Sequence, residues 1–327
     1  MPRASRGQVS RQASQAGEER LKEAPDVATG DLTGAVVRWA VKSLYLDEAL
    51  PRGPLLQWLL QLLLGTKFNH KQLLGLIEAA PGVYADPPDS KRLNFHAVLE
   101  DPPLNFKGFI TEEDVVNSLT MELWQEAVPW ILQGGWPKAS DSSHKYYVVA
   151  SWLQDASEVL NKLSFGHVLG IVKCCAMASG LLGHRGGLLV PYAHSEECER
   201  HVNARTGKPT HVNAGEVYVK SWPELQACLK CLLQESKDGV MEVSKLKSTF
   251  RARFSMELSE TVFGHQCLSK LLADSRIGEE FTLDTCVGNR YMLQLRRIPG
   301  ASGESHSSSA SDEQARSPHS QAKVWQI

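Results

Sequence analysis

The apolar residues between Trp222 and Leu295 recur first at helical spacing and then at strand spacing. Steps of three and four residues return to one face of a helix, whereas alternation is typical of a half-buried strand. Three helices are predicted by the apolar sets Leu225, Leu229, Leu232 and Leu233, then Val243, Leu246, Phe250 and Phe254, then Phe263, Cys267 and Leu271. Two strands are predicted by the alternation of Phe281 with Leu283 and of Tyr291, Leu293 and Leu295. Three helices followed by a hairpin is the order of a winged helix-turn-helix.

Boundary residues support this order of elements. Pro223 is tolerated in the first turn of a helix, and Asp238-Gly239 is a stop signal. Ser259 is a good N-cap for the third predicted helix. Val287-Gly288-Asn289 is a turn signal between the two predicted strands.

The N-terminal part of the chain also favours helices. Apolar spacing predicts helices over residues 32–47, 55–64 and 71–79, and Thr111 caps a further helix that continues through Trp124. The order of these helices leaves open a degenerate second helix-turn-helix. No motif indicates a role for this region.

A boundary is predicted where Gly134-Gly135-Trp136-Pro137 precedes the polar letters SDSSH. Residues 146–163 are then predicted to be helical, and residues 168–172 fit either a strand or a buried helix. Leu188-Leu189-Val190 is a strand candidate between glycines and a proline, and residues 195–203 are predicted to form a helix.

Two stretches resemble a known pair of domains. The words LKSTFRARF, LSETVFGHQCLSKLLAD and FTLD resemble the OST-type helix-turn-helix, also called the LOTUS domain. The words FGHVLGIV, LGHRGGLLVPYAHSEE and VKSW resemble the domain that accompanies OST-type modules. The resemblance implies a winged helix that binds RNA, including G-rich RNA, or a DEAD-box helicase. Some relatives also carry a nuclease domain with clustered carboxylates, and no such domain is recognisable in this sequence.

The predicted fold class is α-rich α+β, with a C-terminal winged helix-turn-helix preceded by a mostly helical region and a small α/β associated domain. The predicted segments are a disordered N-terminus (1–30), a helical region of unknown role (31–135), the associated Cys/His-containing domain (136–219), the LOTUS winged helix (220–297) and a disordered Ser-rich tail (298–327).

Composition sets limits on these hypotheses. A chain of 327 residues with 42% apolar content is long enough for two folded domains. The net charge of −2 argues against a general polyanion binder, so any nucleic-acid surface is local. Seven cysteines without a secretory signal suggest a reducing, cytoplasmic compartment, and RNP granules fit an RNA-binding function. The longest apolar run, Leu55 to Leu64, is short of the roughly 20 residues of a membrane span, so no membrane partner is expected.

Basic residues suggest where RNA would bind. Lys247 and Arg251 are four residues apart and share a helix face, and flexible cations on a folded platform suit phosphates. The predicted RNA-binding residues are Lys245, Lys247, Arg251, Arg253, Lys270, Arg276 and Arg290. Nine basic and seven acidic residues from Val240 to Arg297 leave only +2, so a solvated helix face explains the charges equally well. Tyr291 and His265 are candidate rings for base stacking.

A second cluster contains cysteine and histidine. His194, Cys198 and His201 are spaced four and three apart, and His184 is near in sequence, so these four residues are candidate zinc ligands. The spacing matches no standard zinc finger, and surface histidines beside core cysteines are the alternative. Zinc is therefore a candidate cofactor, and no other cofactor is expected.

No constellation predicts catalysis. Cys228-x-x-Cys231 lies within a Leu-rich helical pattern and is expected to be core rather than redox-active. Ser195 lacks a Gly-x-Ser-x-Gly turn, and no P-loop or dinucleotide fingerprint is present. The predicted function is a non-catalytic RNA-binding protein in post-transcriptional regulation. The alternative is an adaptor that binds a DEAD-box helicase or another RNP protein.

Overall fold

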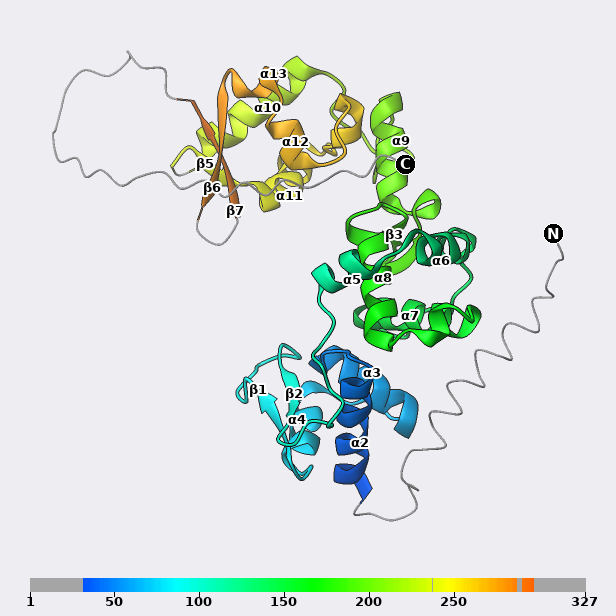
Figure 1. The fold of residues 1–327 in the computed structure, drawn as a ribbon. Helices are drawn as coiled ribbons and strands as arrows, with labels where there is room; N and C mark the ends of the chain where they lie inside the picture. Colours follow the sequence, from blue (N-terminus) through cyan, green and yellow to red (C-terminus); the bar gives the residue numbers. More distant parts are fainter. Residues whose placement is uncertain (1–31, 237, 287–289, 297–327) are drawn as a thin grey trace, which may run out of the picture. The chain divides into compact units, whose positions relative to one another are not determined.

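The computed structural model describes residues 32–236, 238–286 and 290–296, and the chain divides into two compact units after Ser195 (Figure 1). One hydrophobic core extends from Val36 to Leu189, and a second from Val219 to Leu293. The predicted boundaries at 135/136 and 219/220 do not coincide with this division. The predicted disordered ends and the turn at 287–289 lie outside the described residues.

The described chain is helix-rich with small antiparallel sheets, which confirms the α-rich α+β prediction. The described helices all fall short, in length or in apolar content, of what a membrane span requires.

The first unit begins with three helices and a hairpin. These elements are α2 (Leu32–Leu46), α3 (Gly53–Leu64), α4 (His70–Glu78), β1 (Val83–Asp86) and β2 (His96–Leu99). The three helices confirm the sequence prediction to within two residues at each end. The hairpin was not predicted, although Phe95, Ala97 and Leu99 alternate and are buried. Arg52 forms an isolated antiparallel bridge with His96 and so adds a third, one-residue strand.

The rest of the first unit is α5 (Glu112–Ser118), α6 (Met121–Gln133), η1 (Ser142–His144), α7 (Lys145–Ala156), η2 (Leu160–Lys162), α8 (Phe165–Met177), β3 (Leu182–Arg185), β4 (Leu188–Pro191) and η3 (Tyr192–His194). The single helix predicted from Thr111 through Trp124 is wrong, because Thr120 caps a new helix by accepting a hydrogen bond from the Leu123 amide. Residues 168–172 are helical in α8 and buried on several sides, which is why their apolar run lacked a period.

The second unit contains α9 (Glu196–Thr206), α10 (Trp222–Glu235), β5 (Val240–Glu242), α11 (Val243–Phe254), η4 (Glu260–Phe263), α12 (Leu268–Leu272), α13 (Ser275–Gly278), β6 (Phe281–Cys286) and β7 (Arg290–Leu295). Its sheet has the order β5-β7-β6, with both pairs antiparallel. The strand β5 was not predicted, because three half-buried residues are too few to show alternation.

The third predicted helix of this unit is broken into short pieces. Gly264 has a φ of 84° and ends η4 before α12 begins. The Thr261 hydroxyl donates a hydrogen bond to the Lys208 carbonyl and so fixes η4 to the preceding loop. The prediction of one continuous helix with Phe263, Cys267 and Leu271 on one face is therefore wrong.

Candidate nucleic-acid interface

The predicted cations lie on four elements of the second unit. Four of them are on α11, whose opposite face buries Val243, Leu246 and Phe250. The others are Lys270 on α12, Arg276 on α13 and Arg290 on β7. This placement follows from the apolar stripe of α11, because burying the phenylalanine face turns the basic face outward.

Two cations of α11 form ion pairs with nearly buried carboxylates. Lys247 pairs with Glu260 and Arg251 with Glu257, and these two glutamate side chains are only 9% and 10% exposed. The Arg251 Nη2 atom lies 2.9 Å from a Glu257 oxygen, and these hydrogen bonds raise the pKa of Arg251. A carboxylate taken out of water needs such a partner, so both pairs serve the fold of the unit.

Three further cations are paired at the surface. Arg253 forms a forked contact with Glu235, Lys245 lies 3.6 Å from Glu242 in the same turn region, and Arg276 binds Asp274.

The Arg276 guanidinium also stacks over the Trp222 ring at 3.8 Å. It is the main cause that holds the pKa of Asp274 well below its usual value. Five of the seven predicted RNA contacts therefore already have an acidic partner.

Lys270 and Arg290 are different, because neither forms an ion pair with any residue that the structure describes. Both side chains are exposed. The pKa of Glu242 is lowered mainly by the hydrogen bond from Ser244, with smaller contributions from Lys245 and Arg290. Arg290 therefore interacts electrostatically with the Glu242 carboxylate at longer range but forms no ion pair with it.

The two candidate stacking rings have different environments. Tyr291 is 43% exposed and follows Arg290 on β7. His265 is held between two neighbours: its Nε2 atom lies 2.9 Å from Asp274, and its ring packs edge-on against Trp222. Of the two, Tyr291 is the ring that a base can reach.

The candidate zinc ligands are divided between the two units. His184 on β3 and His194 in η3 belong to the first unit, whereas Cys198 and His201 lie on α9 in the second. His184 lies 3.5 Å from the Tyr146 hydroxyl, and His201 Nδ1 is 2.6 Å from the Gln266 amide. No group of three or more His, Cys, Asp or Glu residues within the described parts of the chain is arranged to hold a metal ion. Zinc binding stays a prediction.

The thiols of the Cys-x-x-Cys pair are not activated. Burial is the main cause that raises the pKa of Cys228, and the hydrogen bond to Glu235 is the main cause that raises the pKa of Cys231. Reactive thiols require the opposite shift. The geometry therefore agrees with a structural role for this pair.

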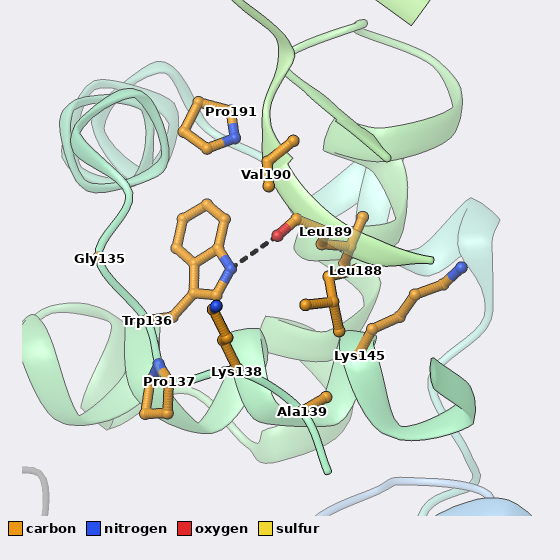
Figure 2. Close-up of a pocket in the computed structure, with 10 residues that line it drawn as sticks. All are labelled: Gly135, Trp136, Pro137, Lys138, Ala139, Lys145, Leu188, Leu189, Val190 and Pro191. Atoms are coloured by element: carbon orange, nitrogen blue, oxygen red, sulfur yellow. Dashed lines mark hydrogen bonds between the residues drawn. The ribbon is translucent and has the colours of Figure 1, made fainter. Parts of the chain in front are cut away.

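A surface pocket of about 200 Å³ lies in the first unit beside β4 (Figure 2). Its wall is the Trp136 ring, whose indole N–H donates a hydrogen bond to the Leu189 carbonyl at 3.0 Å. Lys138 and Lys145 supply its only charged side chains. None of the residues that line it is a carboxylate, histidine, serine or cysteine, so the two lysine amines are the only lining side chains capable of acid–base or nucleophilic chemistry.

No protein-family model, curated protein or solved structure matches this chain.

Proposed function

We propose that the second unit is a winged helix of the OST type and that it binds RNA through Lys270, Arg290 and Tyr291. The observation that carries the proposal is the start of β7, where the exposed Tyr291 ring follows Arg290, an arginine without an ion-pair partner among the described residues. Successive residues of a strand point to opposite faces, so the proposed RNA contacts lie on both faces of the hairpin. The order α10, β5, α11, α12–α13 and the β6–β7 hairpin supports the winged-helix assignment (Figure 1).

The chemistry of these three side chains suits an unpaired RNA segment. Lysine and arginine contact phosphates, which gives affinity with little sequence choice. An aromatic ring stacks on a splayed base, and one stacked base contributes on the order of 1–3 kcal/mol. Lys247 and Arg251 are excluded from the contact surface, because breaking their ion pairs would leave nearly buried carboxylates uncompensated. Lys245 and Arg253 are paired only at the surface, where an ion pair contributes less than about 1 kcal/mol, so their carboxylates compete with phosphate but do not exclude it.

The adaptor alternative has less support from the surface. The exposed large apolar side chains of this unit, among the described residues, are Val202, Val217 and Tyr291. Docking a helicase or another protein through an apolar face requires a contiguous patch rather than scattered residues. If the chain does not bind RNA, a helicase-binding adaptor is the function to test next.

The test is the affinity of the full chain for a fluorescein-labelled G-rich RNA, with an A-rich RNA of equal length as comparison. Binding should weaken with salt, with a slope of log affinity on log salt of about 0.7 for each phosphate contact to a single strand. Lys270→Glu with Arg290→Glu should lower that slope by about 1.4, and Tyr291→Ala should weaken binding by about tenfold.

The matched control is Lys208→Glu with Lys220→Glu, which makes the same change in net charge at two exposed lysines that precede α10. The proposal is wrong if the control and the Lys270/Arg290 variant bind equally. It is also wrong if the unmodified chain binds neither RNA, in which case a pull-down that enriches a DEAD-box helicase after nuclease treatment would establish the adaptor.

A further inference from the structure

Residues 32–99 repeat the element order of residues 222–295. A first helix is followed by a short strand, a second helix, a third helical segment and a hairpin in both stretches. In the first stretch the short strand is Arg52 alone, directly before α3. In the second it is β5, directly before α11. Each of the two stretches lies within one unit.

The strand pairing within residues 32–99 matches the strand pairing within residues 222–295, residue by residue. Arg52 bridges His96 in the last strand of the first copy, and Glu242 pairs with Met292 in the last strand of the second. His96 and Met292 in turn pair with aspartates in the hairpin. The equivalent positions are Arg52 and Glu242, Val83 and Phe281, Asp86 and Asp284, His96 and Met292, Ala97 and Leu293, and Leu99 and Leu295. The strand order is therefore the same in both sheets.

The buried positions of the helices agree as well. Leu56 and Leu60 lie three and seven residues after the start of α3, and Leu246 and Phe250 lie three and seven residues after the start of α11. All four are almost completely buried. The first helices share a buried pattern, with Val37, Ala40, Val41, Leu44 and Tyr45 in α2 and Leu225, Cys228, Leu229, Leu232 and Leu233 in α10. Shared register and shared core positions are what two copies of one module predict, and element order alone would not require them.

We propose that residues 32–99 are a second copy of the C-terminal module and that α4 and the β1–β2 loop form a second RNA-binding surface. This proposal rests on the proposed function, the binding of RNA by this chain. The cations of this second surface are Lys71 on α4 and the adjacent Lys91 and Arg92 in the β1–β2 loop. All three are exposed and form no ion pair with residues that the structure describes.

The cations occupy corresponding elements in the two copies. Lys270 lies on the third helical segment and Arg290 on the hairpin of the second copy, as Lys71 and Lys91 do in the first. The second helix is excluded in both copies for different reasons. The cations of α11 are bound to carboxylates, and α3, with the sequence GPLLQWLLQLLL, has no charged residue. Both copies therefore leave the same two elements for phosphate contacts.

The acidic residues near this surface do not neutralise it. Asp86 lies 3.6 Å from His96. Glu78 is at the opposite end of α4 from Lys71, seven residues and hence roughly 10 Å away along the axis, a distance at which salt screens the interaction. Asp89 is the exposed acid nearest in sequence to Lys91 and Arg92 and forms no ion pair with either.

The experiment compares charge reversals in the full chain, with the same labelled G-rich RNA as probe. One variant carries Lys91→Glu and Arg92→Glu, a second carries Lys270→Glu and Arg290→Glu, and a third combines all four changes. Each pair should lower the salt slope by about 1.4, and the combination by about twice that amount. The control is Lys42→Glu with Lys162→Glu, two exposed lysines of the same unit on α2 and η2. Unchanged circular dichroism and melting temperature establish that each variant is folded.

The outcomes separate the two proposals. If the Lys91/Arg92 variant behaves like its control while the Lys270/Arg290 variant loses affinity, the second surface is refuted and the first stands. If the Lys91/Arg92 variant alone loses affinity, the second surface stands and the first is refuted. If the unmodified chain does not bind the RNA, both are refuted.

Discussion

Replacement of Lys247 by methionine removes the partner of a carboxylate that is almost out of water. The Glu260 side chain is 9% exposed, and the Lys247 side chain is 37% exposed. Loss of one partner from a fully buried pair costs about 3–5 kcal/mol, whereas an exposed pair contributes less than about 1 kcal/mol. A pair with one buried and one half-buried member lies between these limits, so we expect a loss of about 2 kcal/mol for Lys247→Met.

Hydrogen exchange of the α11 amides measures this loss of local stability in the full chain. A single free energy of unfolding is not well defined for a chain with two units, so a local measurement is needed. A loss of about 2 kcal/mol should speed exchange at Leu246 and Phe250 by about 30-fold. Lys270→Met is the matched control, and as a change at an exposed lysine it should alter stability by less than about 0.5 kcal/mol. Addition of Glu260→Gln to the Lys247 variant should restore more than half of the protection, because no unpaired charge then stays buried.

Lys247→Met and Lys270→Met should also differ in their effect on RNA binding. Lys247→Met should leave the affinity unchanged at temperatures where α11 stays folded, whereas Lys270→Met should weaken it. If Lys247→Met instead reduced affinity tenfold with exchange unaltered, the assignment of Lys247 to the fold would be refuted.

Three further predictions concern packing and pH. Phe250→Ala should cost about 3–5 kcal/mol in the second unit, because Phe250 is completely buried, and exchange in α11 would report it. Gly53→Ala should destabilise the first unit by about 1–3 kcal/mol, since a Cβ atom would lie 2.6 Å from the Leu93 carbonyl oxygen, and an unchanged melting temperature would contradict this. Arg276 holds the pKa of Asp274 below 3.8, so this carboxylate stabilises the fold above pH 3.8 and loses its effect as the pH falls from there toward the lowered pKa. The difference in melting temperature between the native chain and Asp274→Asn should accordingly be largest at pH 6 and decrease steadily between pH 4 and pH 2.

The sequence predicted α2, α3, α4, α10 and α11 well, because their apolar faces repeat within a few residues. The stripe Val243, Leu246, Phe250 and Phe254 defined α11, and Leu188 to Val190 defined β4. Short elements without a period were missed, including β5 and the strand β1. Breaks set by a single residue, such as the cap at Thr120, were missed as well.

The candidate site was predictable only in part. The position of the cations on α11, α12 and β7 followed from the pattern, but their partners did not. Glu257 and Glu260 follow α11 in the sequence, and the chain must turn back before they reach Arg251 and Lys247. The tertiary structure was therefore needed to distinguish the cations that form ion pairs from Lys270 and Arg290, which do not. The internal duplication depends on strand register, which helix periodicity does not reveal.

The most direct test of RNA binding at the two surfaces is ultraviolet crosslinking of the full chain to the G-rich RNA, with the crosslinked peptides identified by mass spectrometry. We expect crosslinks in the peptide that contains Arg290 and Tyr291 and in the β1–β2 loop around Lys91 and Arg92. Crosslinks confined to α11, or none at a protein concentration that saturates binding, would contradict it.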